Sequence, residues 1–209
     1  DRCFFIDEQG GFVDGDFLTA LLAEAVLARN PGATILYDVR ASRAVTDTVE
    51  ANGGAAVVNR VGHAFFKARM RELPEAVFGG EVSGHYYFRD FWCADSGTLP
   101  ALLILELLSR TGKTMSELLQ PFRSRYFISG EVNSEVSDPQ GRIDAILAEH
   151  PDAEIGQLDG ITVDYPDWHF SVRSSNTEPL LRLCLESLVS AEDMERKRDA
   201  TLALIRAGS

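Results

Sequence analysis

The chain of 209 residues carries 32 acidic side chains against 20 lysines and arginines, which gives a formal net charge of -12 at pH 7. Its apolar fraction of 45% is that of a globular protein with a buried core, so a disordered or fibrous chain is excluded. The acidic balance argues against nucleic acid and against anionic membrane surfaces as partners, because both require a basic surface.

Cysteine usage and hydropathy narrow the class of protein further. The three cysteines are scattered and form no Cys-x-x-Cys pair, so neither a zinc site nor a disulfide framework is expected. This usage is typical of a reducing cytosol, and we expect a cytoplasmic protein. The longest apolar run, residues 99–108, is about half as long as a membrane span requires, so no membrane is expected. The chain opens at Asp1 without an initiator methionine or a leader-like segment, and we expect it to begin inside a longer protein.

The first part of the chain alternates short apolar runs with helical patterns. Expected strands cover residues 3–7, 33–39, 55–59 and 76–78, and expected helices cover residues 18–26, 42–50, 63–72 and 99–108. Asp14 and Asp16 are expected to cap the first helix, and the last helix is apolar nearly all round, as in a helix buried between layers. This alternation predicts an α/β domain with a mostly parallel sheet flanked by helices.

The pattern changes near Pro121. The expected elements are an extended stretch from residue 126, a helix at 138–149, strands at 161–165, 170–173 and 180–186, and a final helix that begins at Ser190. Consecutive strands followed by a helix predict a smaller α+β domain with an antiparallel sheet and helices. We therefore expect two domains, at residues 1–122 and 123–209. Both tryptophans, Trp92 and Trp168, lie in apolar or aromatic runs and are expected in the cores.

The first candidate site is the loop Gly79-Gly80-Glu81-Val82-Ser83-Gly84-His85, which directly follows an expected strand. Ligands of open α/β sheets collect beyond the carboxyl ends of strands, and glycines let the backbone approach a ligand closely. Glu81 can accept hydrogen bonds from sugar hydroxyls, and His85 titrates near neutrality and can move a proton. The alternative is a surface turn whose serine and glutamate cap a neighbouring helix.

The second candidate site is the segment Arg173-Ser174-Ser175-Asn176-Thr177, with Arg182 further along the chain. Its guanidinium, hydroxyl and amide donors can converge on a tetrahedral oxyanion such as phosphate. The alternative is a hairpin in which Ser175 and Asn176 satisfy the turn and Arg173 pairs with a carboxylate. Because donors dominate this loop in an acidic chain, we favour the anion site. Arg182 lies within a strand, where arginines usually reach solvent or pair on the sheet surface.

Two further polar residues follow neighbouring expected strands. Arg40 comes after the second strand and His63 after the third, so both can face the crevice that Glu81 and His85 face. A lone arginine or histidine at a strand end is more often a local pairing or capping residue, and that alternative stays open.

Together the two loops resemble motifs of the α-D-phosphohexomutase superfamily, most closely of its phosphomannomutase/phosphoglucomutase branch. The sugar loop of that family, Gly-Glu-x-Ser-Gly-His, is similar to residues 80–85, and its phosphate loop, Arg-x-Ser-Asn-Thr, is similar to residues 173–177. The opening Asp1-Arg2 resembles the end of the family's metal loop, Asp-Gly-Asp-x-Asp-Arg. The resemblance covers essentially the whole chain and corresponds to the third and fourth domains of a four-domain enzyme.

The resemblance implies a role for each motif residue. His85 is implied as the general acid or base, and Asp1 as a metal ligand. The implied substrate-binding residues are Glu81 and Ser83 for the sugar hydroxyls, Arg173, Ser175, Asn176 and Thr177 for the phosphate, and His63 and Arg40 in the cleft, with Arg182 as a further candidate beside the phosphate loop. Arg40 stands where many relatives have lysine, so it replaces a point charge with a planar fork.

The resemblance also implies a reaction that this sequence can only partly support. The family's phosphorylated serine and two of its three metal-binding aspartates have no counterpart here, and Asp1 alone cannot build the oxygen-rich site that Mg²⁺ requires. The implied enzyme is an isomerase-class phosphotransferase of carbohydrate metabolism. It interconverts hexose 6-phosphate and hexose 1-phosphate through a phosphoserine, with Mg²⁺ as cofactor and a hexose 1,6-bisphosphate as intermediate.

The expected partners are therefore a hexose phosphate and the missing N-terminal domains, and we expect the chain to be inactive by itself. Two alternatives stay open at this point. One is a stand-alone phosphosugar-binding module, and the other is a fragment of a phosphoglucosamine mutase.

Overall fold

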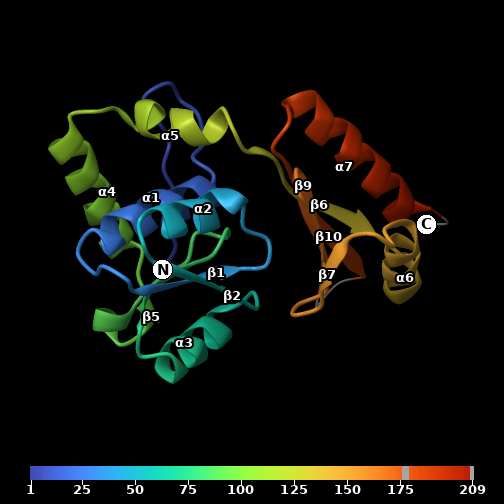
Figure 1. Cartoon of the computed structure of the whole chain (residues 1–209), viewed down its shortest axis with the longest axis horizontal. Coiled ribbons are helices and arrows are strands. Elements are labelled where there is room, and N and C mark those ends of the chain that lie inside the picture. The colour runs from blue at the N-terminus through green and yellow to red at the C-terminus, as the bar shows by residue number, and fades with distance from the viewer. Residues whose placement is uncertain (176–178, 208–209) are drawn as a thin grey trace. The chain divides into compact units, whose positions relative to one another are not determined.

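The computed structural model of the chain describes residues 1–175 and 179–207 (Figure 1). The chain divides into two compact units, Asp1–Ser124 and Arg125–Ser209. The independent domains expected at residues 1–122 and 123–209 stay a prediction, because compactness is not a measure of whether each part folds alone. No helix among the described residues is both long and apolar enough to cross a membrane.

The first unit is built on a mixed five-stranded sheet with the order β2-β1-β3-β4-β5. Its strands are β1 (Thr34–Asp38), β2 (Ala55–Asn59), β3 (Ala76–Gly80), β4 (Tyr86–Phe88) and β5 (Ala94–Asp95). The first three run parallel, as expected, and β4 and β5 add an antiparallel edge. The periodicity of the sequence did not reveal this edge, because strands of three and two residues are too short to show an alternation.

Helices cover both faces of this sheet. They are α1 (Gly15–Leu27), α2 (Arg43–Ala51), α3 (His63–Glu72), α4 (Thr98–Thr111) and α5 (Met115–Arg123), with a short 3₁₀ turn η1 (Arg89–Phe91). Figure 1 shows α1 and α2 on one side of the sheet and α3 on the other. The adjacent residues Ile35 and Leu36 point to opposite faces of β1, and both are fully buried, so apolar runs such as β1 suit a strand covered on both sides.

Two expectations for the start of the first unit were wrong. Residues 3–7 form no strand beyond a single bridge between Ile6 and Phe12. The Asp7 carboxylate accepts hydrogen bonds from the backbone N–H groups of Gln9 and Gly11, at 3.1 and 2.7 Å, and so closes a turn where the strand would have continued. In addition, Asp14 makes no side-chain capping bond to α1.

Helix α4 is buried on one face and not all round. Pro100, Ile104 and Leu107 are buried, whereas Leu102 and Leu105 are 57% and 54% exposed. The buried positions follow the i, i+4, i+7 spacing of one helical face, and the exposed leucines lie on the opposite face. An all-apolar sequence therefore does not by itself establish a helix between two layers.

Trp92 was also expected in the core and is instead 79% exposed. It follows η1 with a backbone φ of 55°, and Cys93 has a φ of 56°. These left-handed conformations are rare for residues other than glycine. They belong to the turn that joins η1 to β5, which places the indole at the surface while Cys93 is buried.

The second unit is an antiparallel sheet with helices on one face. Its strands, in the order β6-β10-β9-β8-β7, are β6 (Phe127–Glu135), β10 (Leu180–Ser187), β9 (Trp168–Ser174), β8 (Ile161–Tyr165) and β7 (Glu154–Gly156). Helices α6 (Pro139–Glu149) and α7 (Ala191–Arg206) lie on the same side of the sheet (Figure 1). As expected, Ser190 caps α7 by accepting a hydrogen bond from the Asp193 N–H.

Alternate residues of these strands build the second core. Residues such as Phe170, Val172, Leu181 and Leu183 point toward the helices and are buried, whereas their neighbours in sequence point to the opposite face. Trp168 packs against this core, as the sequence predicted. The alternation matters for the site, because it fixes which side chains of β9 and β10 lie on the face without helices.

His150 connects α6 to this core. Its ring meets Tyr165, Trp168 and Phe170 edge-on, with centroid distances of 5.8, 5.8 and 5.3 Å. Its Nδ1 atom lies 3.0 Å from the Tyr165 hydroxyl. Burial lowers the pKa of the His150 imidazole, and the nearby charge of Glu149 offsets this effect only in part. The neutral ring is therefore the form that fits the folded unit.

We predict that the second unit loses stability as the pH falls from about 7.5 to about 5.5. The folded pKa of His150 lies below its unfolded value of about 6.5, so the unfolded state binds more protons across this interval. Urea unfolding should be followed by fluorescence in a Trp92→Phe background, where Trp168 is the remaining tryptophan and reports on this unit.

The control for this prediction is His150→Gln, which removes the titrating ring. Subtracting its pH dependence from that of the parent cancels the contributions of the other titratable groups of the unit. An identical pH dependence in the two proteins would contradict the role given to His150.

Candidate functional site

The loop after β3 is a tight turn closed by its own backbone. The Glu81 N–H donates to the His85 carbonyl and the Gly84 N–H donates to the Glu81 carbonyl, both at 2.9 Å. Gly84 has a φ of +83°, and a Cβ atom there would lie 2.7 Å from the Phe4 ring. A side chain at residue 84 would therefore be strained and would also displace Phe4, which explains the glycine of the motif.

The Glu81 carboxylate is buried inside this turn, with 2% of the residue exposed. One oxygen accepts a hydrogen bond from the Gly62 N–H at 2.8 Å, and the other accepts one from the Tyr87 hydroxyl at 2.5 Å. Gly62 precedes α3, whose first residue is the exposed His63. Glu81 thus connects the loop after β2 to the loop after β3. His63, which directly follows Gly62, is thereby held close to the loop that carries Ser83 and His85.

The same carboxylate fixes the state of Tyr87. Burial raises the pKa of the Tyr87 phenol, and the hydrogen bond to Glu81 raises it further. The hydroxyl therefore remains a donor to Glu81 over the whole physiological range.

His85 has the surroundings of a proton-transfer group. Its Nδ1 atom lies 3.0 Å from Ser83 Oγ and 4.0 Å from Glu81 Oε1, and its side chain is 15% exposed. Burial lowers the pKa of His85, the charge of Glu81 opposes this shift, and Arg2 adds to it. The imidazole is consequently neutral near pH 7 and can accept a proton from a bound hydroxyl.

Arg40 lies at the end of β1 in a closed ion pair with Asp38. Its Nη2 and Nε atoms contact the two carboxylate oxygens at 2.8 and 3.0 Å, and the two side chains are 7% and 0% exposed. Asp38 also accepts a hydrogen bond from the Val82 N–H at 3.0 Å. Arg40 thus pairs with Asp38, and Asp38 in turn anchors the 81–85 loop, whereas the role of Arg40 in substrate binding stays a prediction.

Asp1, the expected metal ligand, lies near His85 and Asp95, and one potential ligand atom from each falls within 4.8 Å of the others. Mg²⁺ prefers about six oxygen ligands, whereas this set offers one imidazole nitrogen and two carboxylates. Burial acts to raise the pKa of Asp95, but Lys67, a backbone hydrogen bond and His85 together lower it, and Lys67 Nζ lies 2.7 Å from the carboxylate, which therefore already has a cation. The described residues therefore do not fit a complete Mg²⁺ site, and we derive no step through a metal.

The expected phosphate loop belongs to the second unit. Arg173 near the end of β9 lies directly opposite Arg182 on β10. The backbone N–H of Ser175 donates to the Leu180 carbonyl at 2.9 Å and closes the hairpin on the side that is described. Asn176 and Thr177 lie outside the described residues, so their predicted role stays a prediction.

Both arginines have a carboxylate partner and an unused donor. Arg173 Nη2 lies 3.4 Å from Asp159 Oδ2, and Arg182 Nη1 lies 2.9 Å from Glu131 Oε1. The Nε atoms of both arginines are buried and have no hydrogen-bond partner among the described residues. Buried donors without partners are rare, so these two Nε atoms are candidates for donation to a further acceptor.

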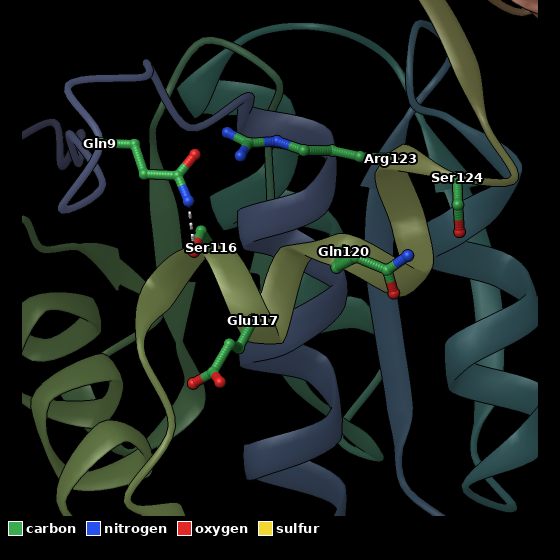
Figure 2. A pocket seen from close by; sticks show the side chains of 6 residues that line it. All are labelled: Gln9, Ser116, Glu117, Gln120, Arg123 and Ser124. Atoms are coloured by element: carbon green, nitrogen blue, oxygen red, sulfur yellow. Dashed lines mark hydrogen bonds between the residues drawn. The ribbon is translucent and has the colours of Figure 1, made fainter.

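A separate hollow of about 410 Å³ lies in the first unit and is lined by residues of α5, by Ser124 after it and by Gln9 from the N-terminal segment (Figure 2). The lining residues are Gln9, Ser116, Glu117, Gln120, Arg123 and Ser124. Several already serve local structure: Gln9 donates to Ser116, Glu117 accepts a hydrogen bond from the Thr114 N–H, and Arg123 pairs with Asp7. None of the predicted site residues that the structure describes lines it, so we assign it no role in the site.

Reasoning from the sequence missed four residues of the site. Asp38 and Tyr87 hold the first loop in place, and Asp159 and Glu131 pair with the two arginines. Only Asp38 carried a signal, because it ends a strand two residues before Arg40. The other three are brought to the site by strand pairing and by a turn, which a motif in the sequence does not show.

Comparison with known proteins agrees with this architecture. Residues 14–126 match the model of the phosphoglucomutase/phosphomannomutase alpha/beta/alpha domain III, and residues 131–204 match the model of the phosphoglucomutase/phosphomannomutase C-terminal domain. An α/β unit with a polar loop at its strand ends, followed by this antiparallel unit, defines a member of the α-D-phosphohexomutase superfamily. Within it, the chain belongs to the phosphoglucomutase/phosphomannomutase family.

Named relatives support the same family. The chain is 43% identical over 208 residues to a phosphomannomutase of Escherichia coli and 42% identical to a phosphohexose mutase of Xanthomonas campestris. The two matches include 98% and 99% of this chain but only 45% and 46% of the relatives. The chain therefore spans about half the length of these relatives.

A solved phosphoglucomutase/phosphomannomutase family protein of Burkholderia thailandensis superposes with a TM-score of 0.84 at 32% identity. This match covers 100% of the chain and 45% of that structure.

We predict that Glu81→Gln destabilises the first unit by about 1–3 kcal/mol, the cost of leaving one buried donor unpaired. The amide side chain has one acceptor oxygen for two donors, so either the Gly62 N–H or the Tyr87 O–H loses its acceptor. Urea unfolding measures the loss, and the amide shift of Gly62 in NMR spectra reports whether its bond is the one that breaks. Glu24→Gln, an equal change at an exposed site on α1, is the control. Equal stability of the two variants would contradict the anchoring role of Glu81.

Proposed function

We propose that the chain is the sugar- and phosphate-binding part of a phosphohexomutase that interconverts hexose 6-phosphate and hexose 1-phosphate. The observation that carries the proposal is the loop at residues 81–85. Two buried carboxylates, Asp38 and Glu81, hold it at the carboxyl end of the parallel strands, and a neutral His85 lies beside Ser83 on it. Such strand ends are where open α/β sheets bind ligands.

In this proposal the 81–85 loop recognises the sugar. Ser83 and His85 are partly exposed and offer a hydroxyl and an imidazole to the sugar hydroxyls. Glu81 contributes through the lone pairs that Gly62 and Tyr87 leave free. His85 takes the proton of the sugar hydroxyl as it attacks a phosphoryl group and returns a proton in the reverse step.

The loop that begins at Arg173 binds the phosphate of the same substrate. A guanidinium with a free buried Nε gives a charge-assisted hydrogen bond, and Arg182 opposite it adds a second positive charge. The expected contributions of Ser175, Asn176 and Thr177 complete this part of the proposal.

The phosphoryl group itself comes from outside these 209 residues. In the proposed reaction a phosphoserine passes its phosphoryl group to the hydroxyl of a hexose monophosphate and becomes a free serine. The resulting hexose 1,6-bisphosphate then returns its other phosphoryl group to that serine. This chain supplies orientation of the substrate and proton transfer, and the remaining half of the enzyme supplies the phosphoserine and a metal site.

We predict that the 209-residue chain alone shows only background mutase activity. A coupled assay with glucose 1-phosphate or mannose 1-phosphate, Mg²⁺ and a hexose 1,6-bisphosphate activator measures it. The reason is chemical, because no group in the motifs found here can donate a phosphoryl group. Turnover at the rate of a complete mutase would overturn the proposed division of labour.

We further predict that Arg173→Ala weakens the binding of a hexose phosphate by about 1.5–3 kcal/mol, or about one to two decades in Kd. His85→Ala should leave the binding of inorganic phosphate nearly unchanged, because His85 is assigned to the sugar. NMR titration measures both, with Arg110→Ala on the exposed side of α4 as a control for loss of one positive charge. Loss of phosphate binding in His85→Ala but not in Arg173→Ala would show that the two roles are reversed.

A further inference from the structure

Four charged side chains lie in a row across the second unit. Glu131 on β6 pairs with Arg182 on β10, Arg182 lies opposite Arg173 on β9, and Arg173 pairs with Asp159 in the turn before β8. Like charges that face one another across strands are unfavourable unless something compensates them. Here the two arginines lie in the middle of the row, and one carboxylate at each end, Glu131 or Asp159, compensates the charge of its neighbour.

The two ends of the row differ in quality. Glu131 contacts Arg182 at 2.9 Å, a normal charge-assisted hydrogen-bond distance, whereas Asp159 approaches Arg173 only to 3.4 Å and through one oxygen. The buried pair of Arg40 and Asp38 in the first unit shows the contrast, because there two nitrogens meet two oxygens at 2.8 and 3.0 Å. Asp159 therefore balances the charge of Arg173 but does not satisfy all of its hydrogen-bond donors.

The backbone explains why Asp159 is held at this distance. The next residue, Gly160, has a φ of +74°, and a Cβ atom there would lie 2.3 Å from the Val172 carbonyl and 2.8 Å from Arg173 Cα. The turn is thus pressed against β9 at the residue that carries the guanidinium, so the aspartate is a fixed neighbour. Both side chains are mostly buried, at 12% and 15% exposed, and water screens their attraction only in part.

We propose that Asp159 is a counter-charge that sets the phosphate affinity of Arg173. It neutralises the guanidinium when no phosphate is bound and opposes the incoming anion, so phosphate binds less tightly than the arginine alone would allow. The inference rests on the proposed phosphate role of Arg173. The counter-charge also speeds the release of phosphate, because a phosphate group bound beside a fixed carboxylate dissociates more readily than one bound by guanidinium groups alone.

The test is a titration of inorganic phosphate into the 209-residue chain, followed by NMR, with Asp159→Asn as the main variant. The amide keeps the size of the side chain and removes its charge, so the Kd for phosphate should fall by ~3- to 10-fold. Damage to the fold weakens binding and does not tighten it, so a gain of affinity identifies the counter-charge directly. The gain should shrink as salt is added.

Two matched variants sharpen the result. Asp159→Glu keeps the negative charge and should stay within about twofold of the parent. Asp152→Asn removes one negative charge from an exposed residue of the same unit and should also have little effect, which separates a local counter-charge from the net charge. Equal or weaker binding in Asp159→Asn, or equal tightening in Asp152→Asn, would overturn the inference.

Arg173→Gln separates failure of the inference from failure of the proposed function. Loss of phosphate binding in this variant supports the role of Arg173 on which the inference depends. Phosphate binding that survives unchanged in Arg173→Gln would overturn that role, and the inference would fall with it. We expect Asp159→Asn to bind phosphate more tightly than the parent. We expect the double variant Asp159→Asn with Arg173→Gln to lose this binding.

Discussion

The architecture of the first site depends on buried carboxylates that accept hydrogen bonds from the backbone of other loops. Asp38 accepts a hydrogen bond from the N–H of Val82, and Glu81 accepts one from the N–H of Gly62. An ionised carboxylate is costly to bury, and each of these is compensated, Asp38 by Arg40 and Glu81 by two hydrogen bonds. Three strand-end loops therefore form one connected network, and a ligand meets a surface whose backbone is already in place.

The two sites handle charge in opposite ways. In the first unit the ion pair of Asp38 and Arg40 is bidentate and closed, so it serves positioning. In the second unit the Nε atoms of Arg173 and Arg182 are buried and have no partner among the described residues, so each can still donate to an acceptor. The phosphate role proposed for this pair therefore rests on local hydrogen-bond donors, because each guanidinium already has a carboxylate beside it and the chain as a whole has a net charge of -12.

Long periodic segments and glycine-rich motifs were readable from the sequence. The parallel strands, the capped helices α2 and α7 and both candidate loops were predicted from apolar periodicity and from turn residues. The short strands β4, β5 and β7 were not, because two or three residues carry no period. The predictions that α4 is buried all round and that Trp92 lies in the core were wrong. A hydrophobic sequence indicates that a segment tends to be buried, but it does not indicate which other element covers it. Partners such as Asp159 depend on tertiary register, which no local pattern contains.

The facing position of Arg173 and Arg182 also ties binding to the correctness of the fold. Side chains alternate between the two faces of a strand, so a slip of β10 by one residue against β9 would turn Arg182 toward the helices, among Phe170 and Val172. That register buries a guanidinium in an apolar core and removes it from its place opposite Arg173, where the proposed anion site lies. The facing arginines thus link strand register to stability, because the register that would separate them also buries a charge in the apolar core.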